Sequence, residues 1–298
     1  MAKSGVRARR KSFEENPIFS ELEFVAKLKV TPELKREMGS MSPQEARYLF
    51  DMFTNSQDDR IAAGQRVREL EKAGRPSTYT QFLHDGYASM ENSMQALLSA
   101  YVESQPIGRW MTSIVAVGPI TAASILARVD IDKAIYAGNI WSYAGYNPNM
   151  VWEKGMKRPF NPNFKFNLIN VGRSFKYRKD PKFKSLYADL INKRKRAEVN
   201  LNLSGEYRLI AERHARETPE TNRDTVRYAY LSGMYNKEFY LNEDERGAAF
   251  RAGKIPTEPM PGAFPMLPPA HIDQRANRYA IKIFISHVHH IWRALHTG

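Results

Sequence analysis

The stretch IVAVGPITAASILARVD, from Ile114 to Asp130, decides how the middle of this chain folds. A helical pattern stops at Ala116, passes through Val117, Gly118 and Pro119, and restarts at once with small residues. Two interpretations fit this pattern: an ordinary helix-to-helix turn, or a helix-hairpin-helix unit whose turn presents backbone N–H groups to a phosphate. The rest of the sequence has to distinguish between them.

The turn contains the residue types that a phosphate-binding hairpin needs. Val117 would fill the core as an apolar plug, and Gly118 would let the backbone approach a phosphate because it carries no side chain. Pro119 suits the first turn of the second helix, and Thr121 can cap that helix or reach a phosphate. The unpaired N–H groups and positive dipole end of this helix would add to the anion site.

Small residues flank the turn on both sides. Ala122 and Ala123 permit close packing of the second helix. Ala116 stands where such hairpins usually carry a first glycine, so it must keep an ordinary backbone conformation or accept strain. The local pattern therefore leaves both interpretations open.

Composition favours a polyanionic partner. The 298 residues carry a formal net charge of +13, which favours nucleic acid first and an anionic membrane second. The sequence contains no cysteine, which excludes disulfides, thiolate nucleophiles and cysteine-ligated metals. No apolar run approaches the roughly 18 residues that a membrane span needs, and no apolar segment follows the basic start MAKSGVRARRKSF. We therefore expect a cytoplasmic protein with no membrane partner.

Most of the chain has helical patterning, and strand signals are sparse. Ser42, Pro43 and Glu45 form a capping box that predicts the start of a helix. After a break at Gly74 to Ser77, apolar residues at helical spacing predict a second long helix. The sequence therefore predicts a mainly α fold that includes an antiparallel helical hairpin.

The expected organisation has five parts. The prolines between 256 and 269 predict an extended connector, and the last segment regains apolar residues at helical spacing. In chain order we expect a basic tail and irregular segment at 1–40, the long helical hairpin at 41–105, a helix-hairpin-helix and basic DNA-binding region at 106–195, an insertion with the proline-rich connector at 196–270, and a C-terminal helix at 271–298 that packs on the core.

A basic and aromatic segment follows the turn. Between 154 and 184 the sequence sets a single acid, Asp180, against Lys154, Lys157, Arg158, Lys165, Arg173, Lys176, Arg178, Lys179, Lys182 and Lys184. Cations neutralise phosphates without regard to base sequence, and aromatic side chains can stack on unpaired bases. Phe160, Phe164 and Phe166 lie among prolines and asparagines in an expected loop and are the stacking candidates, whereas we expect Phe175 in the core.

Four segments share an order with a known family. DDRIAAGQRVRELEKAG, SIVAVGPITAASILARVD, IWSYAGYNP and DPKFKSLYADL follow one another over roughly 58–193. This part of the chain resembles the C-terminal half of Piv-type insertion-sequence transposases, the DEDD recombinases guided by a bridge RNA. The resemblance implies a helical domain that contacts DNA and, in that family, also guide RNA.

Two departures from the family bear on chemistry. The family carries an N-terminal RNase H-like domain whose acidic residues bind divalent metal, and we expect none here because too few residues precede the hairpin. The family also places a nucleophilic serine shortly after the segment that matches Gly145 to Pro148, where this chain has Glu153. A carboxylate cannot replace a hydroxyl that must form a phosphoester with DNA. We therefore expect no catalytic residue, no metal and no cofactor.

Two other clusters were considered as sites. His287 and His290 would share a face of the last helix beside His289, a pattern that a metal could use. Glu243, Asp244 and Glu245 form an acidic run that we expect in a solvated loop. We expect both clusters to lack a metal, with the histidines on the helix surface or partly buried.

These observations favour a non-catalytic nucleic-acid-binding protein, DNA before structured RNA, which acts with the nucleoid in mobile-element or phage DNA transactions. One alternative is an active transposase or recombinase with a displaced nucleophile or a catalytic domain supplied in trans, and another is an RNA-binding ribonucleoprotein component. Homo-oligomerisation is left open. The expected binding residues are Val117, Gly118, Pro119, Thr121, Lys154, Lys157, Arg158, Phe164, Lys165, Phe166, Arg173, Lys176 and Arg178.

Overall fold

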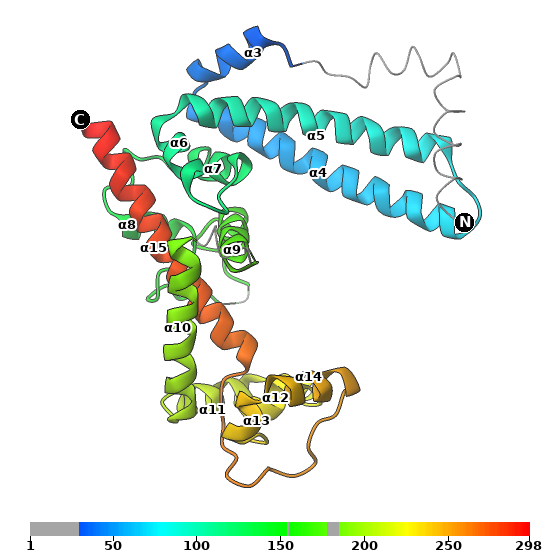
Figure 1. The fold of residues 1–298 in the computed structure, drawn as a ribbon, viewed down its shortest axis with the longest axis vertical. Coiled ribbons are helices and arrows are strands. Elements are labelled where there is room, and N and C mark those ends of the chain that lie inside the picture. Colours follow the sequence, from blue (N-terminus) through cyan, green and yellow to red (C-terminus); the bar gives the residue numbers. More distant parts are fainter. Residues whose placement is uncertain (1–29, 154, 178–184) are drawn as a thin grey trace. The chain divides into compact units, whose positions relative to one another are not determined.

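The computed structural model describes residues 30–153, 155–177 and 185–298 (Figure 1). This part of the chain is mainly helical and contains no strand, which confirms the predicted fold class. The described residues form two compact units, 30–140 with 288–298, and 141–287. The basic tail, Lys154 and Arg178 lie outside the described residues.

Two long helices dominate the first unit, after the short elements α3 (Pro32–Glu37) and η1 (Met38–Ser40). α4 (Pro43–Lys72) and α5 (Thr78–Ser104) lie side by side (Figure 1). The Ser42 hydroxyl accepts the N–H of Glu45, and the Glu45 carboxylate accepts the N–H of Ser42 at 2.7 Å. The predicted capping box is therefore confirmed, and it opens one continuous helix as far as Lys72.

A partly buried polar group joins α4 to α5. The guanidinium of Arg60 pairs with the carboxylate of Glu91, and the Gln57 amide donates to the same carboxylate at 3.0 Å. Burial alone would raise the pKa of Glu91, but these bonds outweigh it and hold the pKa below its ordinary value. Because the donors come from α4 and the acceptor from α5, the group fixes how the two helices align.

The opening stretch forms the next two helices, α6 (Pro106–Ser113) and α7 (Pro119–Leu126). α6 follows α5 so closely that a Cβ on Gly108 would lie 2.1 Å from the carbonyl oxygen of Val102. α7 packs against α4, α5 and α6, and its residues from Ala122 to Leu126 are buried. The last residues of the chain also belong to this unit, where the Nε2–H of His289 donates to the carbonyl of Ala134 at 2.7 Å.

The second unit begins within α8 (Ala137–Tyr143) and contains α9 (Pro162–Tyr177), α10 (Leu186–Leu203) and most of α15 (Pro269–Thr297). Phe175 is buried as predicted, with ring centroids 4.7 Å from Tyr187 and 5.4 Å from Phe284. A Cβ on Gly172 would lie 2.2 Å from the amide oxygen of Asn277, so α9 and α15 meet closely there.

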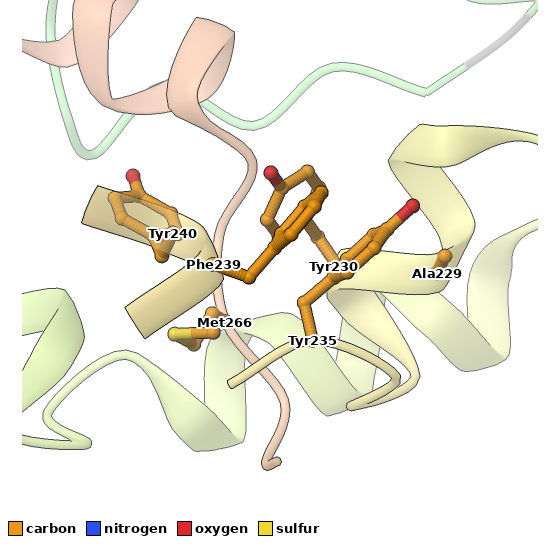
Figure 2. Close-up of a cluster of buried hydrophobic side chains, with 6 residues drawn as sticks. All are labelled: Ala229, Tyr230, Tyr235, Phe239, Tyr240 and Met266. Carbon is orange, nitrogen blue, oxygen red and sulfur yellow. The ribbon is translucent and has the colours of Figure 1, made fainter. Parts of the chain in front are cut away.

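The expected insertion folds into short helices with a core of their own. These are α11 (Arg208–Glu217), η3 (Glu220–Asn222), α12 (Val226–Leu231), α13 (Lys237–Leu241) and α14 (Glu243–Ala252). Figure 2 shows the core cluster, in which the rings of Tyr235 and Phe239 stack at 4.3 Å and Met266 is fully buried. The connector after α14 is not helical, as its prolines predicted.

Glu243 to Glu245 are exposed as expected, but the expectation that they lie in a loop is wrong. These acids form the first turn of α14, and the Asn242 side chain caps that turn by accepting the N–H of Glu245 at 3.1 Å. Negative side chains are favourable at a helix N-terminus because of the helix dipole. The cluster therefore has a structural explanation.

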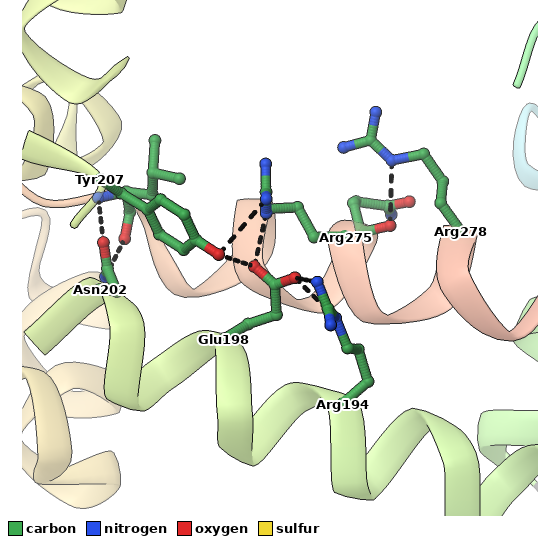
Figure 3. Close-up of polar contacts among 8 residues, drawn as sticks. Arg194, Glu198, Asn202, Tyr207, Arg275 and Arg278 are labelled. Atoms are coloured by element: carbon green, nitrogen blue, oxygen red, sulfur yellow. Dashed lines mark hydrogen bonds and ion pairs between the residues drawn. The ribbon is translucent and has the colours of Figure 1, made fainter. Parts of the chain in front are cut away.

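One buried carboxylate orders the start of α15 (Figure 3). Glu198 on α10, 1% exposed, accepts the hydroxyl of Tyr207 and the guanidinium of Arg275, each at 2.6 Å, and pairs with Arg194. Burial acts to raise the pKa of Glu198, but these partners hold it below its ordinary value. One turn further along, Arg278 donates to the backbone carbonyl of Gln274 at 3.2 Å and to no other group in the described part of the chain.

Candidate nucleic-acid interface

The turn between α6 and α7 has an unusual backbone at its first position. Ala116 has φ of 76°, and no other described residue except glycine has a positive φ. The left-handed region costs an alanine about 1–2 kcal/mol, because Cβ crowds the carbonyl oxygen. Ala116 therefore takes, with strain, the conformation expected of the glycine that phosphate-binding hairpins carry here.

The apolar residues of the turn occupy the core as predicted. Val117 is 4% exposed and acts as the plug, and its N–H donates to the carbonyl of Ile114 at 3.0 Å. Ala122 and Ala123 are fully buried, which confirms their role in close packing of α7. Buried side chains thus anchor the turn in the core, while Gly118 and Pro119 remain exposed.

The outer edge of the turn presents unpaired backbone donors. Gly118 caps α7 with φ of −86°, no side chain caps the helix, and the first backbone bond joins Ala122 N–H to the Gly118 carbonyl. The N–H groups of Ile120 and Thr121 therefore have no partner within the helix. Thr121 does not cap α7, which corrects one of its two expected roles.

Neither packing nor backbone conformation requires a glycine at Gly118. A Cβ built there would meet nothing within 4 Å, and its φ is one that any residue adopts. The free protein thus leaves open space beside Gly118 at the start of α7. A phosphate bound there could approach the backbone without meeting a side chain.

In the second unit, the motif SYAGYNP is the C-terminal cap of α8. Gly145 has φ of +70°, its N–H donates to the Ser142 carbonyl at 3.0 Å, and the Tyr146 N–H donates to the Trp141 carbonyl at 2.7 Å. These are the two bonds of a Schellman motif, which needs glycine at this position. The ring of Phe160 also covers Gly145, because an added Cβ would lie 2.7 Å from it.

Asn161 closes the loop that follows α8. Its N–H donates to the Tyr143 carbonyl at 2.8 Å, and its side-chain amide donates to the Tyr143 hydroxyl at 2.9 Å. Its side-chain oxygen accepts the N–H of Phe164 and so caps α9, with Pro162 at the first helical position. The described part of the loop that carries Lys157 and Arg158 therefore lies between the end of α8 and the start of α9.

This cap corrects the loop expected around the phenylalanines. Phe164 and Phe166 lie on α9, and Phe164 is fully buried with its ring 5.4 Å from that of Tyr143. Phe164 cannot stack on a base, because it faces the core from the first turn of a helix. Phe166 is 58% exposed and remains accessible.

The loop forms an open depression with a basic rim. It has a volume of about 440 Å³ and is lined by Tyr143, Lys157, Arg158, Pro159, Phe160 and Asn161, which together we call the loop depression. Lys157 and Arg158 are exposed, and the Arg158 guanidinium lies 5.3 Å from the ring of Trp152. Lys157 and Arg158, two of the predicted phosphate contacts, therefore line the same depression as the rings of Tyr143 and Phe160.

Two further cations bear on this surface: Lys165 from α9 lies against Phe160, and Arg278 from α15 acts on Lys165 through its charge. The ammonium of Lys165 lies 4.5 Å from the ring centre of Phe160, and desolvation followed by repulsion from Arg278 and Arg158 lowers the pKa of Lys165. Desolvation and repulsion from Arg275 likewise lower the pKa of Arg278. We call Arg158, Lys165 and Arg278 the cation cluster.

The other expected phosphate contacts are not gathered at one place. Lys176 forms an ion pair with Asp273 at 2.7 Å, and Asp273 also pairs with Lys195 at 2.9 Å, so part of its charge is neutralised. Arg173 is exposed and donates to the Asn170 side chain at 3.3 Å. The structure thus brings together Lys157, Arg158 and Lys165, and adds Arg278, Tyr143 and Tyr146.

The chemistry considered at other positions has structural explanations. The hydroxyl of Tyr187 lies 2.9 Å from Nδ1 of His287, and His289 binds a backbone carbonyl. Across the described ranges, no group of three histidine, aspartate or glutamate side chains could hold a metal ion. Glu153 is exposed in the loop.

Comparisons with known proteins give no match: no protein-family model, no curated protein and no solved structure is similar to the chain. Of the helices within the described ranges, none has the length and apolar content to cross a membrane.

Proposed function

We propose that this protein binds nucleic acid, DNA before RNA, by gripping backbone phosphates at the turn between α6 and α7. The carrying observation is the strained left-handed backbone of Ala116 beside an uncovered helix start. Strain of this kind persists at sites where a ligand uses the geometry.

The charge distribution supports the same function. The chain has a net charge of +13, and among the described residues none of Lys157, Arg158 and Lys165 forms an ion pair with a carboxylate. When cations without acidic partners neutralise phosphates, the counterions condensed on the nucleic acid are released. The resulting affinity falls steeply as the salt concentration rises. Backbone binding without a marked sequence preference is the expected outcome.

We further propose a role in mobile-element or phage DNA transactions, which rests on the resemblance to Piv-type transposases alone. In this proposal the protein is not a catalyst, because Glu153 stands where the family has its nucleophilic serine.

The test is binding of a labelled DNA duplex over a series of salt concentrations, with Gly118→Glu and Gly86→Glu compared. Each variant replaces a glycine of the first unit with a glutamate, so the change in charge is the same. An added Cβ meets open space at both positions, so neither substitution should cause a clash. Gly86 lies in α5, well before the end of α5 from which α6 follows. Any difference between the variants therefore reports on the turn.

We expect Gly118→Glu to weaken duplex binding by about tenfold or more at low salt, because its carboxylate would occupy the phosphate position. Gly86→Glu should have a much smaller effect. Equal weakening in both variants would contradict the proposal, and so would a wild-type chain that binds no nucleic acid.

A further inference from the structure

We propose that the loop depression binds one unpaired nucleotide of a nucleic-acid strand, with the phosphate on the cation cluster and the base against Tyr143. The inference rests on the proposed function for the identity of the ligand, but it concerns a different surface in the second unit. It predicts a preference for single strands at this surface that the turn between α6 and α7 does not have.

The cation cluster has no acid to balance it. Arg158 and Lys165 form no ion pair among the described residues, and Arg278 donates only to a backbone carbonyl. The carboxylate that acts on Arg278 from a distance is Glu198, which is already bound by Arg194 and Arg275. Like charges held together lose energy unless an anion joins them. A phosphate would supply that anion.

A buried hydroxyl lies beside the cluster without a partner. Tyr146 is 7% exposed, and its hydroxyl has no hydrogen-bond partner within the described structure. The ammonium of Lys165 lies 5.9 Å from its ring centre, and Arg278 acts on the hydroxyl electrostatically. An unpaired buried hydroxyl costs free energy, and a bound phosphate that reached it would supply the missing partner.

Tyr143 offers a fixed aromatic surface for a base. Its ring is held by Phe164 at 5.4 Å, and its hydroxyl accepts the side-chain N–H of Asn161 at 2.9 Å. The side chain is nevertheless 37% exposed and lines the loop depression. An aromatic ring held in place loses little entropy when a base stacks on it.

The size and shape of the depression favour an unpaired nucleotide. Its volume of about 440 Å³ lies within the range of sites for small ligands. A base within a duplex has both faces covered by its neighbours, so it cannot lie against Tyr143 unless it leaves the stack. A phosphate from a duplex could still reach the cations, which is why the base contact must be tested separately.

The experiment uses the full chain and a fluorescein-labelled oligothymidylate, with a duplex of matched length beside it. Tyr143→Leu removes the flat ring, and Tyr143→Phe keeps it. The double variant Arg158→Gln with Lys165→Gln removes two charges from the cluster. Arg251→Gln with Lys254→Gln removes two charges near the end of α14 and serves as the matched control. Circular dichroism checks that each variant is folded.

We expect Tyr143→Leu to weaken oligothymidylate binding by about fivefold or more, since a stacked base contributes that much, while Tyr143→Phe and duplex binding stay near wild type. The cluster variant should weaken oligothymidylate binding by about tenfold. The control should change it far less. Equal weakening of both strand forms by Tyr143→Leu, or equal loss in the control, would overturn the inference.

Equilibrium dialysis with thymidine 5′-monophosphate separates this inference from the proposed function. Oligothymidylate and nucleotide binding that the cluster variant abolishes, together with duplex binding that Gly118→Glu and Gly86→Glu weaken equally, would support the inference and contradict the proposed function. Oligothymidylate and nucleotide binding that ignore the cluster variant would overturn the inference, and loss of duplex binding in Gly118→Glu would still support the proposed function.

Discussion

Replacing the strained alanine with glycine should stabilise the protein. Ala116→Gly removes about 1–2 kcal/mol of left-handed strain. Against this gain stand about 0.5–1 kcal/mol for the greater freedom of glycine in the unfolded chain, and a few tenths for loss of a half-buried methyl group. The net expectation is a stabilisation of about 0.5 kcal/mol.

Ala73→Gly is the matched control for this prediction. Ala73 is exposed at the end of α4 and has φ of −78°, so glycine relieves nothing there and should cost about 0.5–1 kcal/mol. The two variants should therefore differ by about 1–1.5 kcal/mol, with opposite signs relative to wild type. Urea denaturation followed by circular dichroism measures both. Equal destabilisation by the two glycines would refute the left-handed conformation of Ala116.

Three further predictions concern stability. Gly108→Ala should cost about 1–3 kcal/mol, because its Cβ would lie 2.1 Å from the backbone oxygen of Val102, which cannot rotate away; urea denaturation measures the loss, and a neutral result would contradict the close approach. Gly145→Ala should cost about 1–3 kcal/mol through its φ of +70° and the ring of Phe160, and the same assay would disprove it if stability were unchanged. Burial, then repulsion from nearby cations, lowers the pKa of His271 from 6.5 to about 4. The stability that the neutral His271 contributes to the folded chain is therefore fully present above pH 6.5 and is lost as the pH falls toward 4. His271→Gln should therefore flatten the pH dependence of unfolding between these values, and an unchanged curve would count against it.

Local signals in the sequence predicted much of the fold. The capping box at Ser42 depends on residues three apart, and the proline-rich connector depends on fixed φ angles, so both could be read without tertiary information. The burial of Val117 follows from the apolar character of the turn. Each of these features is decided by neighbours in the chain.

The helix that replaces the expected loop around Phe164 has a local signal in the sequence. Asn161 followed by Pro162 is a helix start, which places Phe164 in the first turn of α9 rather than in a loop. The same applies to Asn242 before the acidic run, which it caps as the start of α14.

Other features were not decided by the local sequence. The pattern places Ala116 where such hairpins carry glycine, but it does not show whether the alanine adopts the left-handed conformation. Arg278 joins the cation cluster from the last helix, so its role depends on how α9 and α15 pack. The partnerless hydroxyl of Tyr146 is likewise visible only in the folded chain.

The most direct test of the central claim is amide hydrogen exchange across the turn, with and without duplex DNA. The N–H groups of Gly118, Ile120 and Thr121 are the donors that a phosphate would engage. Saturating DNA should slow exchange in peptides that cover 114–124, while peptides from the middle of α5 stay unchanged. Exchange at the turn that is unaffected by bound DNA would contradict the claim that this turn grips the phosphate backbone.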